Sequence, residues 1–228
     1  MQSIAEHLAE RAGETRREIT AAARACGRDP ADVRLVAVSK TRPAEQIRQL
    51  AAAGIQDFGE NYLQEALDKI AALADLDLRW HFIGAIQSNK TRPIAEHFHW
   101  VHTVSRVRIA ERLSAHCPPG KTLNVTLQVN IDGDPAKSGA DPAAVEELLA
   151  AAADLPGLRV RGLMTILRME SEPFAAYRRL AALFDALAAR APEPWDTLSM
   201  GMSGDFREAI AAGATHVRLG TALFGPRN

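Results

Sequence analysis

The sequence predicts an α/β protein, a single (β/α)8 barrel of the TIM type with an extra N-terminal helix. Eight strand-then-helix units follow a leading helix, and eight is the number of units that closes a barrel. The 228 residues lie near the lower end of the roughly 200–400 residues usual for such barrels. No GxGxxG follows the first strand-like segment, which disfavours the alternative, a doubly wound open sheet that binds a dinucleotide.

The leading helix is expected over residues 3–26, where apolar residues recur at steps of three and four until Gly27. The segments that follow it alternate between apolar, β-branched runs and amphipathic runs. Strands are expected at 33–39, 55–61, 80–86, 100–104, 122–131, 158–166 and 196–200, and within 215–225.

Helices are expected between these strands at 43–54, 62–73, 89–98, 106–116, 141–155, 172–190 and 204–213. Proline and glycine mark several of their ends. Pro43 and Gly54 bound the first of these helices, and Asp141 and Pro142 form the start of another. Pro93 falls inside the 89–98 segment, so that helix should be short or kinked.

Composition and charge exclude several classes of protein. Apolar residues make up 47% and charged residues 24% of the chain, and the net charge is −1, which disfavours nucleic acid or a membrane as a partner. Cys26 and Cys117 form no CxxC pattern, and no signal peptide or membrane span is visible. We expect one domain over residues 1–228, cytoplasmic and monomeric, because no apolar run suggests an interface.

Functional residues of a barrel lie at the carboxyl ends of its strands. Lys40 directly follows the first predicted strand, 33–39, at the point where its apolar run stops. The other predicted strand ends carry Glu60, Asn61, Gly84, Gln87, Thr103, Ser105, Asn130, Met164, Thr165, Ser199, Ser203, Gly220 and Thr221. One ammonium, several amides and hydroxyls, and a group of glycines are therefore expected at one mouth.

The stretch SMGMSGDF, residues 199–206, has the features of an anion site. Gly201 and Gly204 flank Ser203 just before a predicted helix that Ser203 is expected to cap. Loops after strands 7 and 8 often bind phosphate in barrels, and Gly220 and Thr221 follow strand 8 with Arg218 nearby. The alternative is a turn that needs glycine for its geometry alone.

Lys40 has two interpretations. It is the solvated end of a strand, or a desolvated amine whose lowered pKa frees its lone pair for a carbonyl group. Combined with a phosphate site, the second interpretation suggests a sugar phosphate in an aldolase, or pyridoxal 5′-phosphate (PLP). Lys90 is the competing amine, but it lies in a polar loop and should be solvated.

A histidine group, His97, His99 and His102, raises the possibility of a metal site. No fourth ligand stands at a spacing typical of zinc, so packing within the strand is the favoured interpretation and no metal is expected.

Seven motifs, in order, resemble the pyridoxal phosphate homeostasis protein family. They are AVSKTRP, FGENYLQE, WHFIGAIQSNK, VNIDGDPAKSG, GLMTI, LSMGMSGDFREAI and VRLGTALFG. The resemblance implies a barrel like the N-terminal domain of bacterial alanine racemase. It implies that Lys40 holds PLP as an internal aldimine, a Schiff base, and that Arg218 approaches the pyridine nitrogen. It also implies that Ser203, Gly220 and Thr221 hold the phosphate, with Asn61 and Ser199 near the cofactor.

The resemblance implies intracellular PLP (vitamin B6) homeostasis, with effects on amino-acid and keto-acid balance and no established turnover; the implied partners are PLP-dependent apoenzymes. An arginine cannot protonate the pyridine, so the ring is a poor electron sink. We expect no second domain to supply an opposing base, and neither Tyr62 nor Tyr177 stands where one is needed. A weak PLP-dependent racemase or lyase is the alternative. Gly204 departs from the family's pattern, which commonly has an acidic residue there.

Overall fold

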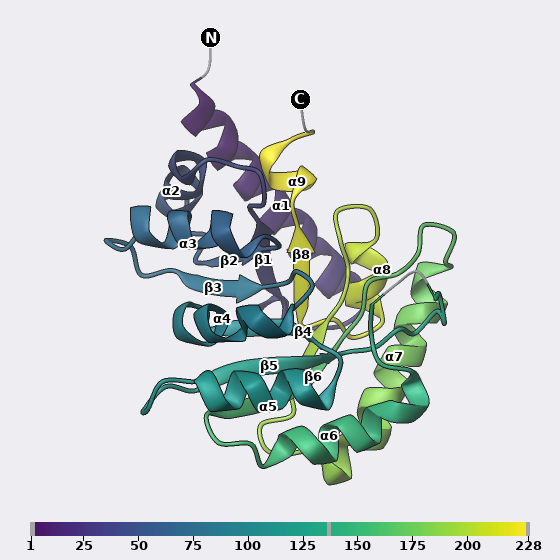
Figure 1. The fold of residues 1–228 in the computed structure, drawn as a ribbon. Helices are drawn as coiled ribbons and strands as arrows, with labels where there is room; N and C mark the ends of the chain where they lie inside the picture. The colour runs from purple at the N-terminus through teal and green to yellow at the C-terminus, as the bar shows by residue number, and fades with distance from the viewer. Residues whose placement is uncertain (1–2, 136–137, 227–228) are drawn as a thin grey trace.

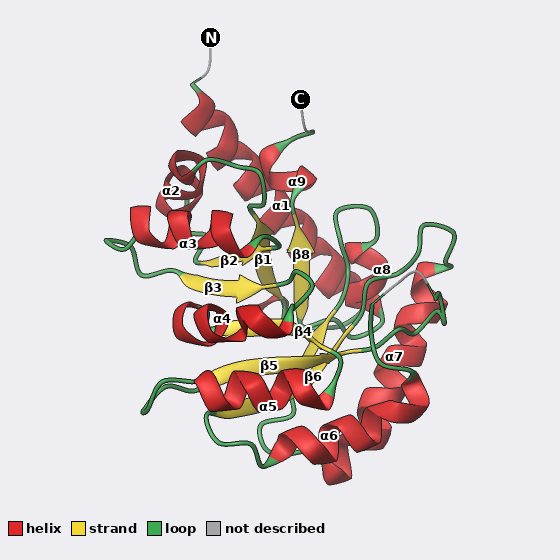
Figure 2. Cartoon of the chain, viewed as in Figure 1, coloured by secondary structure: helices red, strands yellow, loops and turns green. Residues whose placement is uncertain are grey.

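The protein is a closed barrel of eight parallel strands with helices around it, as Figures 1 and 2 show for the computed structural model. The structure describes residues 3–135 and 138–226. Residues 136 and 137, which belong to the motif VNIDGDPAKSG, lie outside the described residues. The strands are β1 (Arg34–Val38), β2 (Asp57–Glu60), β3 (Arg79–Phe82), β4 (Trp100–Val104), β5 (Leu123–Gln128), β6 (Leu158–Met164), β7 (Thr197–Ser199) and β8 (His216–Leu219).

Each strand pairs in parallel with its neighbours in sequence, and β1 pairs with β8 to close the ring. The prediction of a (β/α)8 barrel over an open sheet is therefore confirmed. Closure brings together residues far apart in sequence. Arg34 of β1 is the register partner of His216 of β8, and Val36 is the partner of Arg218.

The helices cover the outside of the barrel. They are α1 (Ile4–Ala25), α2 (Ala44–Ala52), α3 (Leu63–Ala72), α4 (Thr91–His97), α5 (Val107–His116), α6 (Val145–Ala153), α7 (Pro173–Leu187), α8 (Phe206–Ala211) and α9 (Thr221–Phe224). The leading helix begins with a reciprocal cap in which Ser3 and Glu6 bond to each other's backbone N–H groups. It packs against α2, α8 and α9, so the two ends of the described chain lie on the same side in Figure 1.

Two helix starts refine the sequence predictions. The helix around Pro93 is short, as expected, but it is not interrupted, because Pro93 lies in the first turn of α4, where no backbone N–H is needed. The helix expected from Asp141 begins as a 3-10 turn over Pro142–Ala144, with the Asp141 carboxylate accepting from Ala143 N–H, and becomes α-helical at Val145.

The core has an apolar and a polar part. Apolar side chains fill the space between strands and helices, with Phe58, Ile47 and Leu113 among the fully buried ones. The interior of the barrel instead holds buried polar side chains, of which His81 and His102 are fully buried. Branched aliphatic residues are the usual filling of such interiors, so the polar content here calls for an explanation from function.

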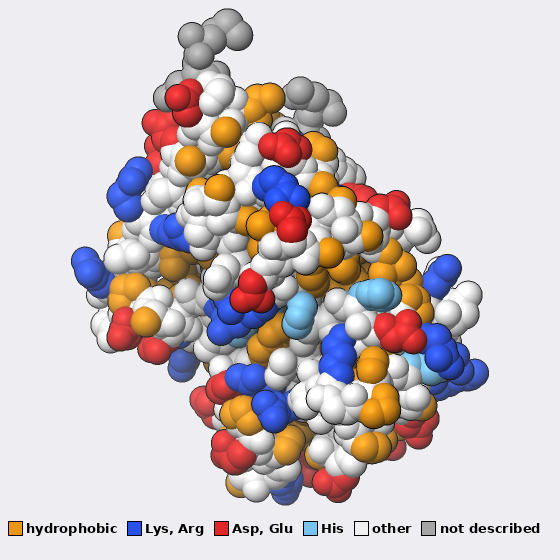
Figure 3. Space-filling model, turned by 90° about the vertical axis from the view of Figure 1, so that its left-hand side faces the viewer, with side chains coloured by type: hydrophobic (Ala, Val, Ile, Leu, Met, Phe, Trp, Pro, Cys, Tyr) orange, Lys and Arg blue, Asp and Glu red, His pale blue; other side chains and the backbone are white. Residues whose placement is uncertain are grey.

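The surface carries charges of both signs. On the face drawn in Figure 3, acidic and basic side chains are interspersed, with no large region of one sign. Among the described helices, none combines the length and the apolar character needed to cross a membrane.

Candidate functional site

A cavity of about 300 Å³ opens at the carboxyl ends of β1, β2 and β8. Six of the seven residues assigned to the cofactor from sequence line it. These are Lys40, Asn61, Ser203, Arg218, Gly220 and Thr221. The walls between these polar groups are Val38, Ile83, Ile166 and Met202, which sequence reasoning did not single out. We call this space the cofactor cavity.

Lys40 is half-buried, and the residues on both sides of it are fixed in position. On one side, the Ser39 hydroxyl donates to Glu60 Oε1 at 2.6 Å. On the other, Thr41 is the one non-glycine residue with positive φ, +63°, among those that the structure describes. Its backbone N–H donates to Glu65 of α3. A β-branched residue in this conformation costs about 1–2 kcal/mol, so the surrounding contacts hold a strained turn that directs Lys40 to the cavity.

Glu60 was expected at the mouth, but it points away from the barrel interior. Its Oε1 accepts from Lys69 Nζ at 2.7 Å, and both side chains are buried between β2 and α3. Burial raises the pKa of Glu60, and the hydrogen bonds from Lys69 and Ser39 oppose that rise. Lys69 Nζ also donates to the Ser39 carbonyl at 2.7 Å. This ion pair therefore fastens the end of β1 just before Lys40.

Asn61 supplies a buried acceptor at the cavity. Its Oδ1 is buried and has no hydrogen-bond partner among the described residues, an unusual and costly state for a polar atom. The backbone of Asn61 lies against Gly84, where a Cβ atom would come within 2.0 Å of the Asn61 carbonyl oxygen. Only glycine permits that approach. An incoming donor would satisfy the Asn61 amide oxygen.

Arg218 is buried and held on two sides. Its Nη1 donates to Ser199 Oγ and its Nη2 to the Thr165 carbonyl, both at 2.8 Å. Burial lowers the pKa of Arg218, with Tyr177 and Asp205 opposing, but an arginine stays protonated in proteins. Ser199 was expected beside the cofactor. It does not line the cavity; instead its hydroxyl accepts from Arg218 and orients that side chain.

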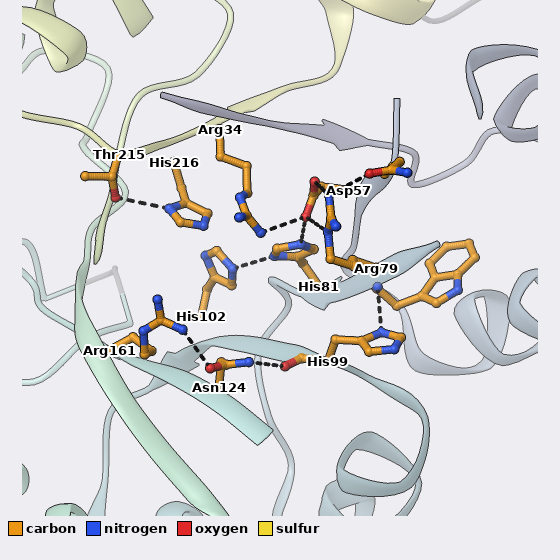
Figure 4. Close-up of polar contacts among 12 residues, drawn as sticks. Arg34, Asp57, Arg79, His81, His99, His102, Asn124, Arg161, Thr215 and His216 are labelled. Atoms are coloured by element: carbon orange, nitrogen blue, oxygen red, sulfur yellow. Dashed lines mark hydrogen bonds and ion pairs between the residues drawn. The ribbon is translucent and has the colours of Figure 1, made fainter. Parts of the chain in front are cut away.

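A continuous row of hydrogen bonds runs from Arg218 through the barrel. Ser199 Oγ lies 2.7 Å from His102 Nδ1, His102 Nε2 lies 2.9 Å from His81 Nδ1, and His81 Nε2 lies 2.9 Å from Asp57 Oδ1. Figure 4 shows the two imidazoles end to end, with Asp57 beyond them. We call this row the interior chain.

The hydrogens of the interior chain follow from its two ends. Arg218 can only donate, so Ser199 accepts from it and gives its own hydrogen to His102 Nδ1. His102 then carries its proton on Nε2 and donates to His81 Nδ1. The remaining proton of His81, on Nε2, is donated to the Asp57 carboxylate. Both histidines are neutral in this arrangement.

The pKa shifts agree with neutral histidines. Burial first, and then repulsion from Arg218 and from any proton placed on His81 or His216, holds the pKa of His102 well below its usual value. Burial also lowers the pKa of His81, against the opposing effect of Asp57. Burial would raise the pKa of Asp57, but hydrogen bonds from His81 and Arg79 outweigh it and the pKa is lowered.

The loops after β7 and β8 form the far wall of the cofactor cavity. Gly201 has φ +93°, and a Cβ there would lie 2.6 Å from that of Ala209, so this position requires glycine. The prediction that Ser203 caps the next helix is wrong: Asp205 is the N-cap of α8. Ser203 Oγ instead accepts from the backbone N–H of Ala222 at 3.3 Å and so ties the two loops together.

The other sequence candidates lie elsewhere. Lys90 is exposed at the end of a 3-10 turn, as expected for a solvated lysine. The three histidines of the 97–102 segment separate: His97 is exposed, His99 Nδ1 accepts from Trp80 N–H, and His102 is inside the barrel. Among the described residues, no group of three or more His, Cys, Asp or Glu side chains is arranged so that it could hold a metal ion.

A second, smaller cavity adjoins the first. It has a volume of about 230 Å³ and shares Asn61, Ile83 and Ile166 with the cofactor cavity, adding Thr103 and Gln128. Thr103, one of the residues predicted at the end of strand 4, therefore lies beside Asn61, whereas Asn130, predicted at the end of strand 5, does not line this cavity.

Comparison with known proteins gives consistent matches. The family model "Alanine racemase, N-terminal domain" matches residues 14–228. A pyridoxal phosphate homeostasis protein of Pseudomonas aeruginosa is 56% identical over all of this chain and 97% of its own length. One from Escherichia coli K12 is 50% identical over all of this chain and 98% of its own length.

Solved structures extend the comparison. PipY of Synechococcus elongatus with PLP bound is 39% identical with a TM-score of 0.85, and the match covers 96% of this chain and all of that one. Alanine racemase of Corynebacterium glutamicum is 19% identical with a TM-score of 0.70, covering 98% of this chain and 61% of that one. The latter match shows a shared fold.

Proposed function

The chain belongs to the pyridoxal phosphate homeostasis protein family, and from this premise we propose that it binds PLP in the cofactor cavity and acts in PLP homeostasis. The observation that carries the proposal is the convergence of the Lys40 amine with the Ser203 and Thr221 hydroxyls in one cavity of about 300 Å³. That volume lies at the lower end of the roughly 300–1,000 Å³ of ligand sites.

The residues present fit the cofactor. PLP combines an aldehyde, a flat ring and a phosphate, and the cavity offers an amine, apolar walls and hydroxyls. The unsatisfied Asn61 Oδ1 is the clearest sign of a missing polar group, because a buried acceptor without a donor costs about 1–3 kcal/mol. Lys40 would hold PLP through its amine, and Ser203, Gly220 and Thr221 would bind the phosphate.

We further propose that the role is binding and delivery rather than turnover. When bound, PLP supplies an aldehyde that combines with amines and a ring that withdraws electrons. Arg218 would offer the ring nitrogen a guanidinium that keeps its proton, so electron withdrawal stays weak. Of the described residues that line the cavity, Lys40 and Arg218 are the titratable ones, and a racemase needs a base on each face of its substrate.

The cellular setting belongs to the same proposal. The barrel would act as one PLP-binding domain, a monomer in the cytoplasm that supplies PLP-dependent apoenzymes. Cys26 and Cys117 are free thiols, which suits a reducing compartment. The exposed large apolar side chains, such as Ile4 and Met169, lie at separate points along the chain.

The test is a titration with PLP followed by visible absorption. Wild-type protein should acquire the yellow colour of bound PLP and keep it after gel filtration. Lys40→Ala should lose that colour, and the matched variant Lys90→Ala should keep it. Wild-type protein that stays colourless would refute PLP binding. Exchange of amino-acid α-protons in D₂O faster than with free PLP would refute the non-catalytic role while leaving binding intact.

A further inference from the structure

Another cavity opens at the opposite mouth of the barrel, where the strands begin. Its volume is about 660 Å³, more than twice that of the cofactor cavity. Arg34, Arg79, Trp100 and His216, the first residues of β1, β3, β4 and β8, line it. We call it the lower cavity.

The lining is rich in guanidinium groups. Arg28, Arg34, Arg79 and Arg161 all line the lower cavity. Their acidic neighbours are fewer: Asp32 and Asp196 line it, and Asp57 lies just beside it, bonded to Arg79. Four guanidinium groups thus face three carboxylates, which leaves an excess of positive charge around the cavity.

Three of these arginines are committed to the protein. Arg28 Nη1 donates to two backbone carbonyls, those of Ile210 and Ala214, at 2.8 Å. Arg79 forms two bonds to the Asp57 carboxylate, at 2.9 and 2.8 Å. Arg161 donates from Nε to Asp196 at 2.9 Å and from Nη1 to the Asn124 side chain at 3.0 Å.

Arg34 differs from the other three. Among the described side chains, Arg34 forms one ion pair, a long one in which Nη1 donates to Asp57 Oδ1 at 3.4 Å. The side chain is 41% exposed and extends into the lower cavity from the first position of β1. A guanidinium carries five N–H donors, so most of its donors remain available to a ligand. Figure 4 shows this group between His216 and Asp57.

His216 provides a second donor beside Arg34. The two residues are register partners on β1 and β8. His216 is 6% exposed, and its Nε2 is buried without a hydrogen-bond partner among the described residues. Thr215 Oγ1 accepts from Leu198 N–H and lies 3.1 Å from His216 Nδ1, so its hydroxyl hydrogen is available for that nitrogen. The imidazole proton is then on Nε2, which becomes an unused donor.

We propose that the lower cavity is a binding site for a metabolite-sized oxyanion, a phosphate ester or a carboxylate, held by Arg34 and His216. The planar fork of Arg34 suits two oxygens of such a group, and the Nε2–H of His216 suits a third contact. The volume exceeds that of a bare ion and falls within the range of small-molecule sites. This site is separate from the cofactor cavity and does not depend on PLP binding there.

The test is isothermal titration calorimetry of PLP-loaded protein with inorganic phosphate and, separately, with succinate, at constant ionic strength. Loading with PLP keeps the probe out of the cofactor cavity. We expect saturable binding of at least one probe. Binding of phosphate alone would indicate a phosphate ester as the ligand, and binding of succinate alone would indicate a carboxylate. Arg34→Gln should weaken binding about tenfold or more, because a hydrogen bond to a charged group is lost. Arg92→Gln is the matched control; Arg92 is exposed and pairs with Glu96 on α4, so its affinity should equal that of wild type.

Absence of saturable binding to either probe would overturn the proposal, as would equal affinity in wild type and Arg34→Gln. A second measurement needs no altered arginine. The indole N–H signals of Trp100, which lines the lower cavity, and of Trp195, which donates to the Phe184 carbonyl elsewhere, can be followed by NMR. The Trp100 signal should shift with the probe while that of Trp195 stays fixed. A Trp100 signal that does not move would refute the site.

Discussion

His81 Nδ1 and His102 Nε2 lie 2.9 Å apart in the interior of the barrel, and neither side chain is exposed to solvent. The distance fits one N–H donating to one lone pair, so the two rings share a single hydrogen between them. A proton added to either ring would break this bond or the next one along the interior chain. The pair is therefore stable only while both rings are neutral.

Stability should fall as the pH falls from 7 to 5. Burial lowers the pKa values of His81, His102 and His216 in the folded protein, whereas unfolded histidine titrates near 6.5. Below about pH 6.5 the unfolded chain binds more protons than the folded one, so the free energy of unfolding drops by up to about 1.4 kcal/mol per pH unit for each histidine. Asp57, whose pKa is lowered, adds its own loss only below about pH 4.

Urea unfolding at pH 7, 6 and 5 measures this slope. His216→Asn removes one buried imidazole outside the interior chain and should reduce the slope, while the surface variant His97→Gln should keep the wild-type slope. Equal slopes in all three proteins would contradict the assignment to buried histidines.

Lys69→Met should destabilise the protein by about 3–5 kcal/mol, because it leaves the buried Glu60 carboxylate without its cation. The double variant Lys69→Met, Glu60→Gln should recover part of that loss, since no buried charge remains. Urea denaturation of the single and double variants provides the measurement. A loss below about 1 kcal/mol in the single variant would show that the pair does not fasten the end of β1.

Asn61→Leu should stabilise the PLP-free protein by about 1 kcal/mol or more, because an unsatisfied buried acceptor is replaced by an apolar group of similar size. The same change should weaken PLP binding, since the acceptor is then missing from the cofactor cavity. Thermal melting and PLP titration give the two readings. Asn89→Leu, at an exposed position, is the control that should not weaken PLP binding; a destabilised Asn61→Leu protein would argue against an orphaned oxygen.

Gly204→Ala should stabilise the protein by about 0.4–1 kcal/mol, since a Cβ there meets nothing within 4 Å and φ is not positive. Gly201→Ala should destabilise it by about 2–4 kcal/mol, because the backbone is left-handed and Ala209 lies too close. Thermal melting of both variants tests the contrast. Equal destabilisation by both changes would show that the loop requires glycine at position 204, although the space around that residue is open.

The sequence was most informative where local pattern and topology agree. Alternating apolar segments predict the eight units, and the strand-end rule brings Lys40, Asn61 and Ser203 to one mouth without any knowledge of side-chain contacts. The role of Ser203 shows the limit of that reasoning. A serine before a helix usually caps it, but here the chain turns once more and Asp205 takes the cap position.

The interior chain was not predictable in the same way. Asp57, His81, His102 and Ser199 come from four different strands, and their contacts depend on the stagger of those strands in the closed ring. Alternation alone would have shown that Asp57 and Asn61 share a face of the strand predicted over 55–61, which is a usable sign of a polar interior. It does not give the height of each residue along the barrel axis, and that height decides which ones touch.

The interior chain has one permitted arrangement of hydrogens, with a single hydrogen between each pair of neighbours and every one of them donated in the direction of Asp57. If one of these hydrogens moved to its acceptor, one pair of neighbouring atoms would have two hydrogens between them and another pair would have none. It can be rearranged only from its ends. One end is Arg218 at the cofactor cavity, and the other is Asp57 beside the lower cavity. The two mouths of the barrel are thus joined by one uninterrupted row of hydrogen bonds, whose direction is set by a group that can only donate at one mouth and a carboxylate that accepts near the other.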